Sequence, residues 1–232
     1  MGRKKSFRYQ DIKTMDRVLF PKLKGTDPIR LEPCWPKNLL NPEHPVFLEL
    51  GCGKGEYTLA LAAKYPERNF IGVDVKSDRL WVGATGAMEA GLENVWFIRA
   101  RIDHLAGYFP AHFADGIWIP FPDPAPGNIS GRKRLTSPRF LNIYRNFLKP
   151  DGLIRCKTDH AGLYDFTLEN LEAGGGRLCR ACEDLHSSDI HDPDILGIES
   201  HFEKEFRKKG YTIKFMEFSL NESIPEYMPM SA

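Results

Sequence analysis

The pattern of hydrophobic and polar positions predicts strands and helices that alternate along the chain from residue 46 onward. Short apolar runs are typical of strands buried in a parallel sheet, and apolar side chains at helical spacing are typical of the helices that cover it. The predicted strands are 46–50, 69–75, 95–98, 116–119 and 153–157. The predicted helices are 56–65, 77–90, 138–148 and 161–173.

This alternation predicts an α/β fold with a doubly wound, mostly parallel sheet and helices on both faces. In such a fold a ligand binds beyond the carboxyl ends of the strands. Segment 211–218 (YTIKFMEF) alternates apolar and polar residues, which predicts an antiparallel strand at the C-terminal end. We expect residues 1–44 to form a basic N-terminal extension and a proline-rich connector, 45–220 the main domain, and 221–232 a tail.

Composition narrows the class of protein. With 42% hydrophobic and 27% charged residues, the 232-residue chain can bury a sizeable core. No apolar run approaches the roughly 18 residues of a membrane span, so no membrane partner is expected. The lack of a secretory signal and the odd number of cysteines, five, favour a reducing, cytoplasmic location. Cys179 and Cys182 lack a second pair of ligands at suitable spacing, so no metal site is expected.

Positive charge is concentrated in two segments, although the net charge is only +1. Residues 1–24 hold eight Lys or Arg against two Asp, and residues 127–157 hold eight against one. Such segments are typical of a surface that binds nucleic-acid phosphates. They are equally typical of a solvated tail and a solvated helix face, and charge alone leaves both interpretations open.

The first predicted strand ends in a glycine-rich turn, LELGCGKG. Glycines such as Gly51 and Gly53 let the backbone turn tightly and approach a ligand closely. Glu49 stands where it would repel a pyrophosphate but attract the amino group of S-adenosylmethionine, which carries no phosphate. Asp74 ends the next strand at the offset where a carboxylate meets ribose hydroxyls. Asp103 follows the third strand and is a candidate for the adenine edge, a helix cap or a surface charge. The turn with Glu49 and Asp74 predicts a cofactor site.

A proline-rich loop, IPFPDPAP, follows the fourth predicted strand at the same edge of the sheet. Four prolines around Asp123 predict a stiff loop that can hold a carboxylate beside a flat base. A rigid turn alone would explain the stiffness but not its place at the ligand end of a strand. Asp123 is therefore the candidate catalytic residue. The aromatic side chains in or beside predicted elements are expected in the core: Trp81, Trp96, Trp118 and Phe121.

The order of these motifs resembles the tRNA (guanine(46)-N7)-methyltransferase family. The resemblance covers residues 46–218 and rests on LELGCGKG, NFIGVDV, the FPDP loop, KRLTSPRFL, Thr158-Asp159 and GIESHFEKEFRKKGYTIKFMEF. It implies a class I, Rossmann-like methyltransferase domain that binds S-adenosylmethionine and modifies position 46 in the variable loop of tRNA. Guanine N7 offers a lone pair and carries no proton, so its methylation is a direct displacement that needs no strong base.

The resemblance also assigns individual residues. The positions implied to bind the cofactor are Glu49, Gly51, Gly53, Asp74, Asp103 and Asp123. The positions implied to hold the guanosine substrate are Asp159, Ser200, His201, Phe202 and Glu203. Asp123 matches the active-site aspartate of the family, and its carboxylate suits the positive charge that develops on the methylated base.

The chain departs from the family pattern in the proline-rich loop. The family usually has tryptophan where this chain has Ala125 and lysine where it has Gly127. The basic residues that remain are Arg132, Lys133 and Arg134, which we expect to bind RNA. Two alternatives stay open: a methyltransferase of the same fold that acts on another RNA base or on protein, and a tRNA-binding homologue without catalysis. Retention of the acidic positions favours the methyltransferase, which acts as a monomer or a homodimer.

Overall fold

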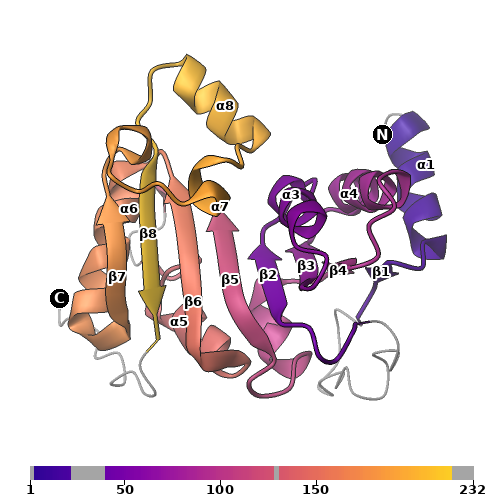
Figure 1. Ribbon diagram of the computed structural model, residues 1–232, viewed down its shortest axis with the longest axis horizontal. Coiled ribbons are helices and arrows are strands. Elements are labelled where there is room, and N and C mark those ends of the chain that lie inside the picture. The colour runs from indigo at the N-terminus through magenta and orange to yellow at the C-terminus, as the bar shows by residue number, and fades with distance from the viewer. Residues whose placement is uncertain (1–2, 22–39, 128–130, 221–232) are drawn as a thin grey trace.

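The protein is described by a computed structural model over residues 3–21, 40–127 and 131–220 and is built on an eight-stranded sheet (Figure 1). The strand order is β1-β4-β3-β2-β5-β6-β8-β7. The strands are β1 (Val18–Leu19), β2 (Val46–Leu50), β3 (Asn69–Asp74), β4 (Val95–Arg99), β5 (Ala114–Pro120), β6 (Leu148–Thr158), β7 (Arg177–Cys182) and β8 (Lys214–Ser219). The order reverses direction at β2 and β5, the point where open α/β sheets bind ligands.

Every strand pair is parallel except the two that involve β8, which runs antiparallel to β6 and to β7. The predicted doubly wound, mostly parallel sheet with an antiparallel C-terminal strand is therefore confirmed. The predicted strand over 211–218 forms later, at Lys214–Ser219. The pattern does not predict β7, because this edge strand has no buried residue and gives no apolar alternation.

Helices cover both faces of the sheet, as the alternation predicts. The α-helices of the described part are α1 (Arg3–Asp11), α3 (Glu56–Lys64), α4 (Ser77–Glu89), α5 (Pro138–Arg145), α6 (Ala161–Asn170), α7 (Pro193–Leu196) and α8 (His201–Lys208). Shorter helical turns are η1 (Ile12–Thr14), η2 (Ile102–Gly107), η3 (Leu171–Gly175) and η4 (Leu185–Ser187). Helix α8 is not predicted from the sequence, where its first residues are interpreted only as a substrate motif.

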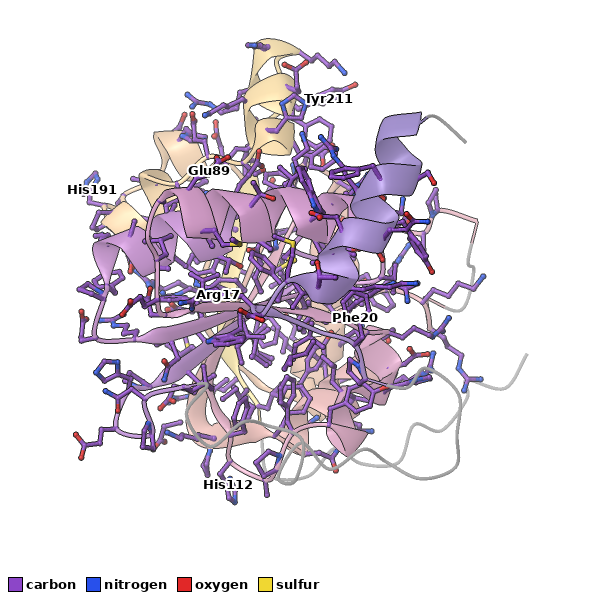
Figure 2. All side chains as sticks on the ribbon, turned by 90° about the vertical axis from the view of Figure 1, so that its right-hand side faces the viewer. Arg17, Phe20, Glu89, His112, His191 and Tyr211 are labelled. Atoms are coloured by element: carbon purple, nitrogen blue, oxygen red, sulfur yellow. The ribbon has the colours of Figure 1, made fainter. Side chains whose placement is uncertain are left out.

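The core consists of two layers, one on each face of the sheet. Strand β4 shows the division, because Val95 and Phe97 belong to the cluster under α3 and α4, whereas Trp96 and Ile98 belong to the cluster under α5. Figure 2 shows α1 and α4 together on one face and α5 on the opposite face. In Figure 1 the arrowheads of β2 and β5 point toward the edge where α8 lies.

Residues 3–21 pack onto the domain expected for 45–220. Helix α1 lies against α4, and the indole Nε1 of Trp81 donates a hydrogen bond of 2.6 Å to the Asp11 carboxylate. Strand β1 pairs with β4, and Arg17, labelled in Figure 2, donates to the carbonyl of Glu93 at 2.7 Å. Much of the expected connector and the whole tail lie outside the described residues. Within the described ranges, no helix combines the length and apolar character needed to cross a membrane.

Candidate active site

A pocket of about 900 Å³ opens at the carboxyl ends of the parallel strands. Most residues predicted to bind cofactor or substrate line it, although they come from segments far apart in the sequence. The predicted residues in its wall are Glu49, Gly51, Gly53, Asp74, Asp103, Asp123, Lys133, Ser200, His201 and Phe202. Asp159, Glu203, Arg132 and Arg134 do not belong to the lining. The structure thus brings most of these candidates together in one pocket and leaves four of them outside its lining.

The glycine-rich turn between β2 and α3 forms one wall. The backbone N–H groups of Gly51 and Cys52 both donate to the carbonyl of Val73 in β3, at 2.8 and 3.1 Å, which fixes the turn to the sheet. Gly55 has a φ of +71°, and a Cβ there would lie 2.7 Å from the ring of Phe97. Both the left-handed backbone and this close approach require glycine, so the turn is held in one conformation as α3 begins.

Glu49 lies in the pocket wall with a side chain that is only 5% exposed. Its Oε2 accepts hydrogen bonds from the backbone N–H of Thr58, at 2.8 Å, and from the Thr58 hydroxyl, at 2.5 Å. Burial nevertheless raises the pKa of Glu49 from 4.5 to about 8, because desolvation outweighs these two bonds. The site therefore has a buried acid whose ionised form a bound cation would stabilise.

Two further acids face the pocket with different partners. Asp74 braces the glycine turn, since its Oδ2 accepts from the N–H of Gly53 at 2.9 Å and its Oδ1 from the N–H of Lys76 at 2.8 Å. Asp103 instead pairs with Arg101, at 2.7 Å, and with Arg139, at 3.2 Å. The bond from Arg101 holds the pKa of Asp103 below its ordinary value. Both acids lie where the sequence predicts them, but the arginine partners of Asp103 were not predicted.

The proline-rich loop after β5 contributes Asp123 to the pocket lining. Its carboxylate is exposed, and Oδ1 accepts a bond of 2.8 Å from the N–H of Ala125. Phe121 and Ala125 adopt positive φ angles, 50° and 45°, which are uncommon for residues other than glycine. Phe121 was expected in the core, but its half-buried ring lines the pocket and packs against Phe206 of α8, 5.7 Å between centroids.

Residues at the start of helix α8 line another part of the pocket. Ser200 is its N-cap, and the Ser200 hydroxyl accepts from the N–H of Glu203 at 3.2 Å. The N–H of His201 donates to Oε2 of Glu56, in the first turn of α3, at 2.7 Å. Phe202 lines the pocket and remains 47% exposed. The predicted substrate motif is thus the start of a capped helix that presents an aromatic ring to the site.

Glu203 points away from the pocket into a buried polar cluster. Its carboxylate and the ammonium group of Lys157 are both 0% exposed and lie 2.9 Å apart. Lys157 also donates to the carbonyl of Ile198 at 3.2 Å, and the hydroxyl of Tyr57 lies 2.8 Å from the same carbonyl. Burial lowers the pKa of Lys157, and the charge of Glu203 opposes that shift. This cluster anchors the segment that leads into α8.

Glu203 also takes part in the group that most resembles a metal site among the described residues. His186, Glu199 and Glu203 place ligand atoms within 4.8 Å of one another. Lys157 and Arg207 already neutralise the two carboxylates, so a cation there would meet like charge. The group is therefore better described as an ion-pair cluster that supports α8.

The pocket also contains basic residues outside the predicted set. Their long side chains reach the pocket from positions without a common spacing, so no motif marks them. The additional basic residues in the wall are Lys54, Lys76, Arg79, Arg101 and Arg139. Together with the acids, they give a site that can bind both a cationic group and an anionic one.

The predicted RNA-binding triplet is divided by the structure. Lys133 is exposed and lines the pocket, and Arg132 is exposed outside it. Arg134 is half-buried and donates from Nε to the carbonyl of Pro124, next to Asp123, at 3.0 Å. Three adjacent basic residues therefore have three different environments.

Comparison with known proteins gives consistent results. A family model with the description "Putative methyltransferase" matches residues 43–216. A tRNA (guanine-N(7)-)-methyltransferase of Bacteroides thetaiotaomicron is 38% identical over 222 residues, which span 95% of this chain and 87% of the relative. A protein of the same description from Christiangramia forsetii is 37% identical over 223 residues, 95% of this chain and 100% of the relative. The crystal structure of the 16S rRNA methyltransferase KamB has a TM-score of 0.61 at 14% identity, covering 80% of this chain and 92% of that one, a likeness of fold alone.

Proposed function

We propose, from the premise that this chain belongs to the tRNA (guanine-N(7)-)-methyltransferase family, that it transfers a methyl group from S-adenosylmethionine to N7 of a guanosine in tRNA. The target we propose is position 46 in the variable loop. The observation that carries the proposal is that a single pocket joins the buried acid at the glycine turn to Asp123 and the exposed ring of Phe202.

S-adenosylmethionine fits the donor set around β2 and β3. A Cβ on Gly51 would meet no protein atom within 4 Å, so the turn leaves open space at the pocket wall. Glu49 offers a buried carboxylate for the amino group, and Asp74 keeps lone pairs for ribose hydroxyls after accepting its two backbone bonds. Asp103, fixed by its arginines, is the acid for the adenine amine. When bound, the cofactor supplies an electrophilic methyl group on a sulfonium.

Phe202, Asp123 and Lys133, which also line the pocket, are the residues that bind and orient the guanine. Since N7 carries no proton, these residues need only hold its lone pair in line with the methyl group, and orientation supplies most of the rate. Phe202 offers a face on which a base can stack in a chain that has Ala125 where the family usually has tryptophan. Asp123 stabilises the positive charge that develops on the guanine ring. Lys133 offers a contact to a phosphate of the tRNA backbone near the target base.

Two predicted substrate residues lie outside the pocket lining and have other roles in this proposal. Glu203 is fully buried and acts on the substrate through the position of α8, which it fixes by its ion pair with Lys157. Asp159 follows β6, half-buried and outside the pocket lining. We propose that it contacts the tRNA around the target base.

The direct test is methyl transfer from labelled S-adenosylmethionine to unmodified tRNA, with the product identified by mass spectrometry. We expect 7-methylguanosine, and no label in a transcript whose guanosine at position 46 is replaced by adenosine. Label in another nucleoside or in protein would support another methyltransferase of this fold, and binding of tRNA without transfer would support the non-catalytic homologue.

A matched pair of variants tests Asp123. We expect Asp123→Asn to lower turnover by about 100-fold, the order of magnitude for losing one group that stabilises transition-state charge. Binding of S-adenosylmethionine, measured by calorimetry, should change little. Asp151→Asn, which removes an exposed carboxylate of β6 outside the pocket, is the control. Normal turnover in Asp123→Asn would remove this residue from the mechanism.

A further inference from the structure

The loop that carries Asp123 has a strained backbone. Phe121 and Ala125, on either side of Asp123, have φ angles of 50° and 45° without being glycine. Such conformations are disfavoured by contacts of the Cβ atom and persist only where the surroundings enforce them. The position of Asp123 therefore depends on contacts from outside the loop as well as on its own bond from the N–H of Ala125.

Two hydrogen bonds tie the backbone of the loop to other segments at different points. The N–H of Phe121 donates to the carbonyl of Lys157 at 2.8 Å and continues the pairing of β5 with β6. Further along, Nε of Arg134 donates to the carbonyl of Pro124 at 3.0 Å. Pro124 directly follows Asp123, so this bond acts one residue from the catalytic carboxylate.

Arg134 is itself tied to helix α6. Its guanidinium carbon lies 4.4 Å from the ring centroid of Phe166, and one terminal nitrogen lies 3.5 Å from the carbonyl of Gly162. The side chain thus bridges the proline-rich loop and α6 through its planar face and its edge. A lysine at this position could keep the charge but could not make the stacked and forked contacts together.

The turn before Arg134 also packs against α6. Gly131 has a φ of +64°, and a Cβ there would lie 2.4 Å from the ring of Phe166. The N–H of Arg134 donates to the carbonyl of Gly131 at 2.9 Å and closes the turn. The backbone consequently packs directly on Phe166 and directs Arg134 inward, whereas Arg132 and Lys133 are exposed.

We propose that Arg134 is a positioning residue for the catalytic loop, which it holds against α6, and that it is not an RNA contact like its two neighbours. The proposal rests on the proposed function, since it concerns the placement of Asp123 for methyl transfer. It revises the sequence-based grouping of Arg132, Lys133 and Arg134 as one phosphate-binding cluster.

Arg134→Lys separates the two roles because it keeps the positive charge. We expect kcat to fall about 10- to 100-fold, since a misplacement of about 1 Å can cost 100-fold. The Kd for tRNA should stay within about twofold of wild type. In Arg134→Gln, the slope of tRNA affinity against salt should equal that of wild type, whereas loss of a phosphate contact would reduce it by about one ion. Arg177→Lys, an exposed arginine on the edge strand β7, is the control and should leave every parameter unchanged.

Phe166→Leu gives an independent route to the same loop. It removes the ring under the guanidinium, leaves every charge in place and lies outside the pocket lining. We expect Phe166→Leu to have a lower kcat than wild type. In the double variant with Arg134→Lys, the fold-loss in kcat should be smaller than the product of the two single losses, because both changes loosen the same contact between Arg134 and Phe166.

Hydrogen exchange of the four non-proline amides within residues 121–127 reports on the loop without needing activity. We expect faster exchange in Arg134→Lys and in Phe166→Leu than in wild type. The proposal is overturned if kcat of Arg134→Lys stays within twofold of wild type, if its loss is in tRNA affinity alone, or if loop exchange does not change. Failure of the wild-type protein to form 7-methylguanosine would instead contradict the proposed function, and the exchange result would still decide whether Arg134 holds the loop.

Discussion

The substitution Glu49→Gln tests the electrostatics of the buried acid that we propose binds the cofactor. The folded protein holds this carboxyl at a pKa of about 8, raised by burial from the ordinary 4.5. Between these pH values the folded state binds one proton more than the unfolded chain, so the free energy of unfolding falls as the pH rises. The stabilisation by the protonated acid is complete below pH 4.5 and is lost as the pH passes through about 8.

The size of the effect follows from the same two pKa values. Each pH unit between them is worth about 1.4 kcal/mol, so from pH 5 to pH 8 the wild-type protein should lose about 3.5 kcal/mol through Glu49 alone. Glutamine has the same shape and can still accept the bond from the N–H of Thr58, at 2.8 Å in the wild type. Glu49→Gln should therefore be the more stable protein at pH 8, and this advantage should shrink by about 3.5 kcal/mol at pH 5.

Urea denaturation at four pH values between 5 and 8 measures this difference. Glu89→Gln is the matched control, because Glu89 is exposed at the end of α4, as Figure 2 shows, and its removal should leave the pH dependence of the wild type unchanged. If wild type and Glu49→Gln lose stability in parallel over this range, the carboxyl of Glu49 is ionised throughout and burial does not raise its pKa.

Three further predictions follow from other parts of the structure. Lys157→Met should lower the free energy of unfolding, measured by urea denaturation, by about 3–5 kcal/mol, because it leaves Glu203 buried without its cation. Glu203→Gln in the same chain should recover part of this loss, and a loss below about 1 kcal/mol in Lys157→Met would contradict the ion pair. Gly72→Ala should lower the free energy of unfolding by about 1–3 kcal/mol, since its Cβ would lie 2.8 Å from the ring of Phe97. Adding Phe97→Leu should relieve part of that loss, and strictly additive losses in the double variant would argue against this clash. Binding of S-adenosylmethionine at pH 7 should release close to one proton from the wild type and none from Glu49→Gln, measured by calorimetry in buffers of different ionisation enthalpy; equal release from both would exclude Glu49 as the source.

The sheet could be predicted from sequence wherever burial on both faces produces an apolar run. Strand β3 (Asn69–Asp74) is buried at every position, and the sequence pattern finds it almost to the residue. The sequence pattern does not predict strand β7, because β7 lies at the sheet edge with Leu178 44% exposed. The pattern does not predict helix α8 either, because its fully buried position is Glu203, where a helical pattern would require an apolar side chain.

The acidic half of the site was predictable because parallel strands deliver their last residues to one edge. Glu49 and Asp74 needed only their strands to be recognised. The ion pair of Lys157 with Glu203 joins residues that are 46 positions apart, and no local spacing encodes it. The separation of Arg134 from its neighbours is likewise invisible in sequence, since it depends on the contact of Gly131 with a ring in α6.

The first turn of α3 joins the two halves of the pocket. Thr58 donates to Glu49 on the cofactor side, Glu56 accepts from the N–H of His201 at the start of α8, and the hydroxyl of Tyr57 lies 3.2 Å from the carboxylate buried under α8. Three consecutive residues of one helical turn thus contact the acid proposed to bind the cofactor, the helix proposed to hold the substrate, and the carboxylate that anchors this helix. Methylation of an unprotonated nitrogen needs no strong base, so its rate depends mainly on how well donor and acceptor are aligned. A single rigid turn that holds both walls meets that requirement more directly than two separately anchored loops would.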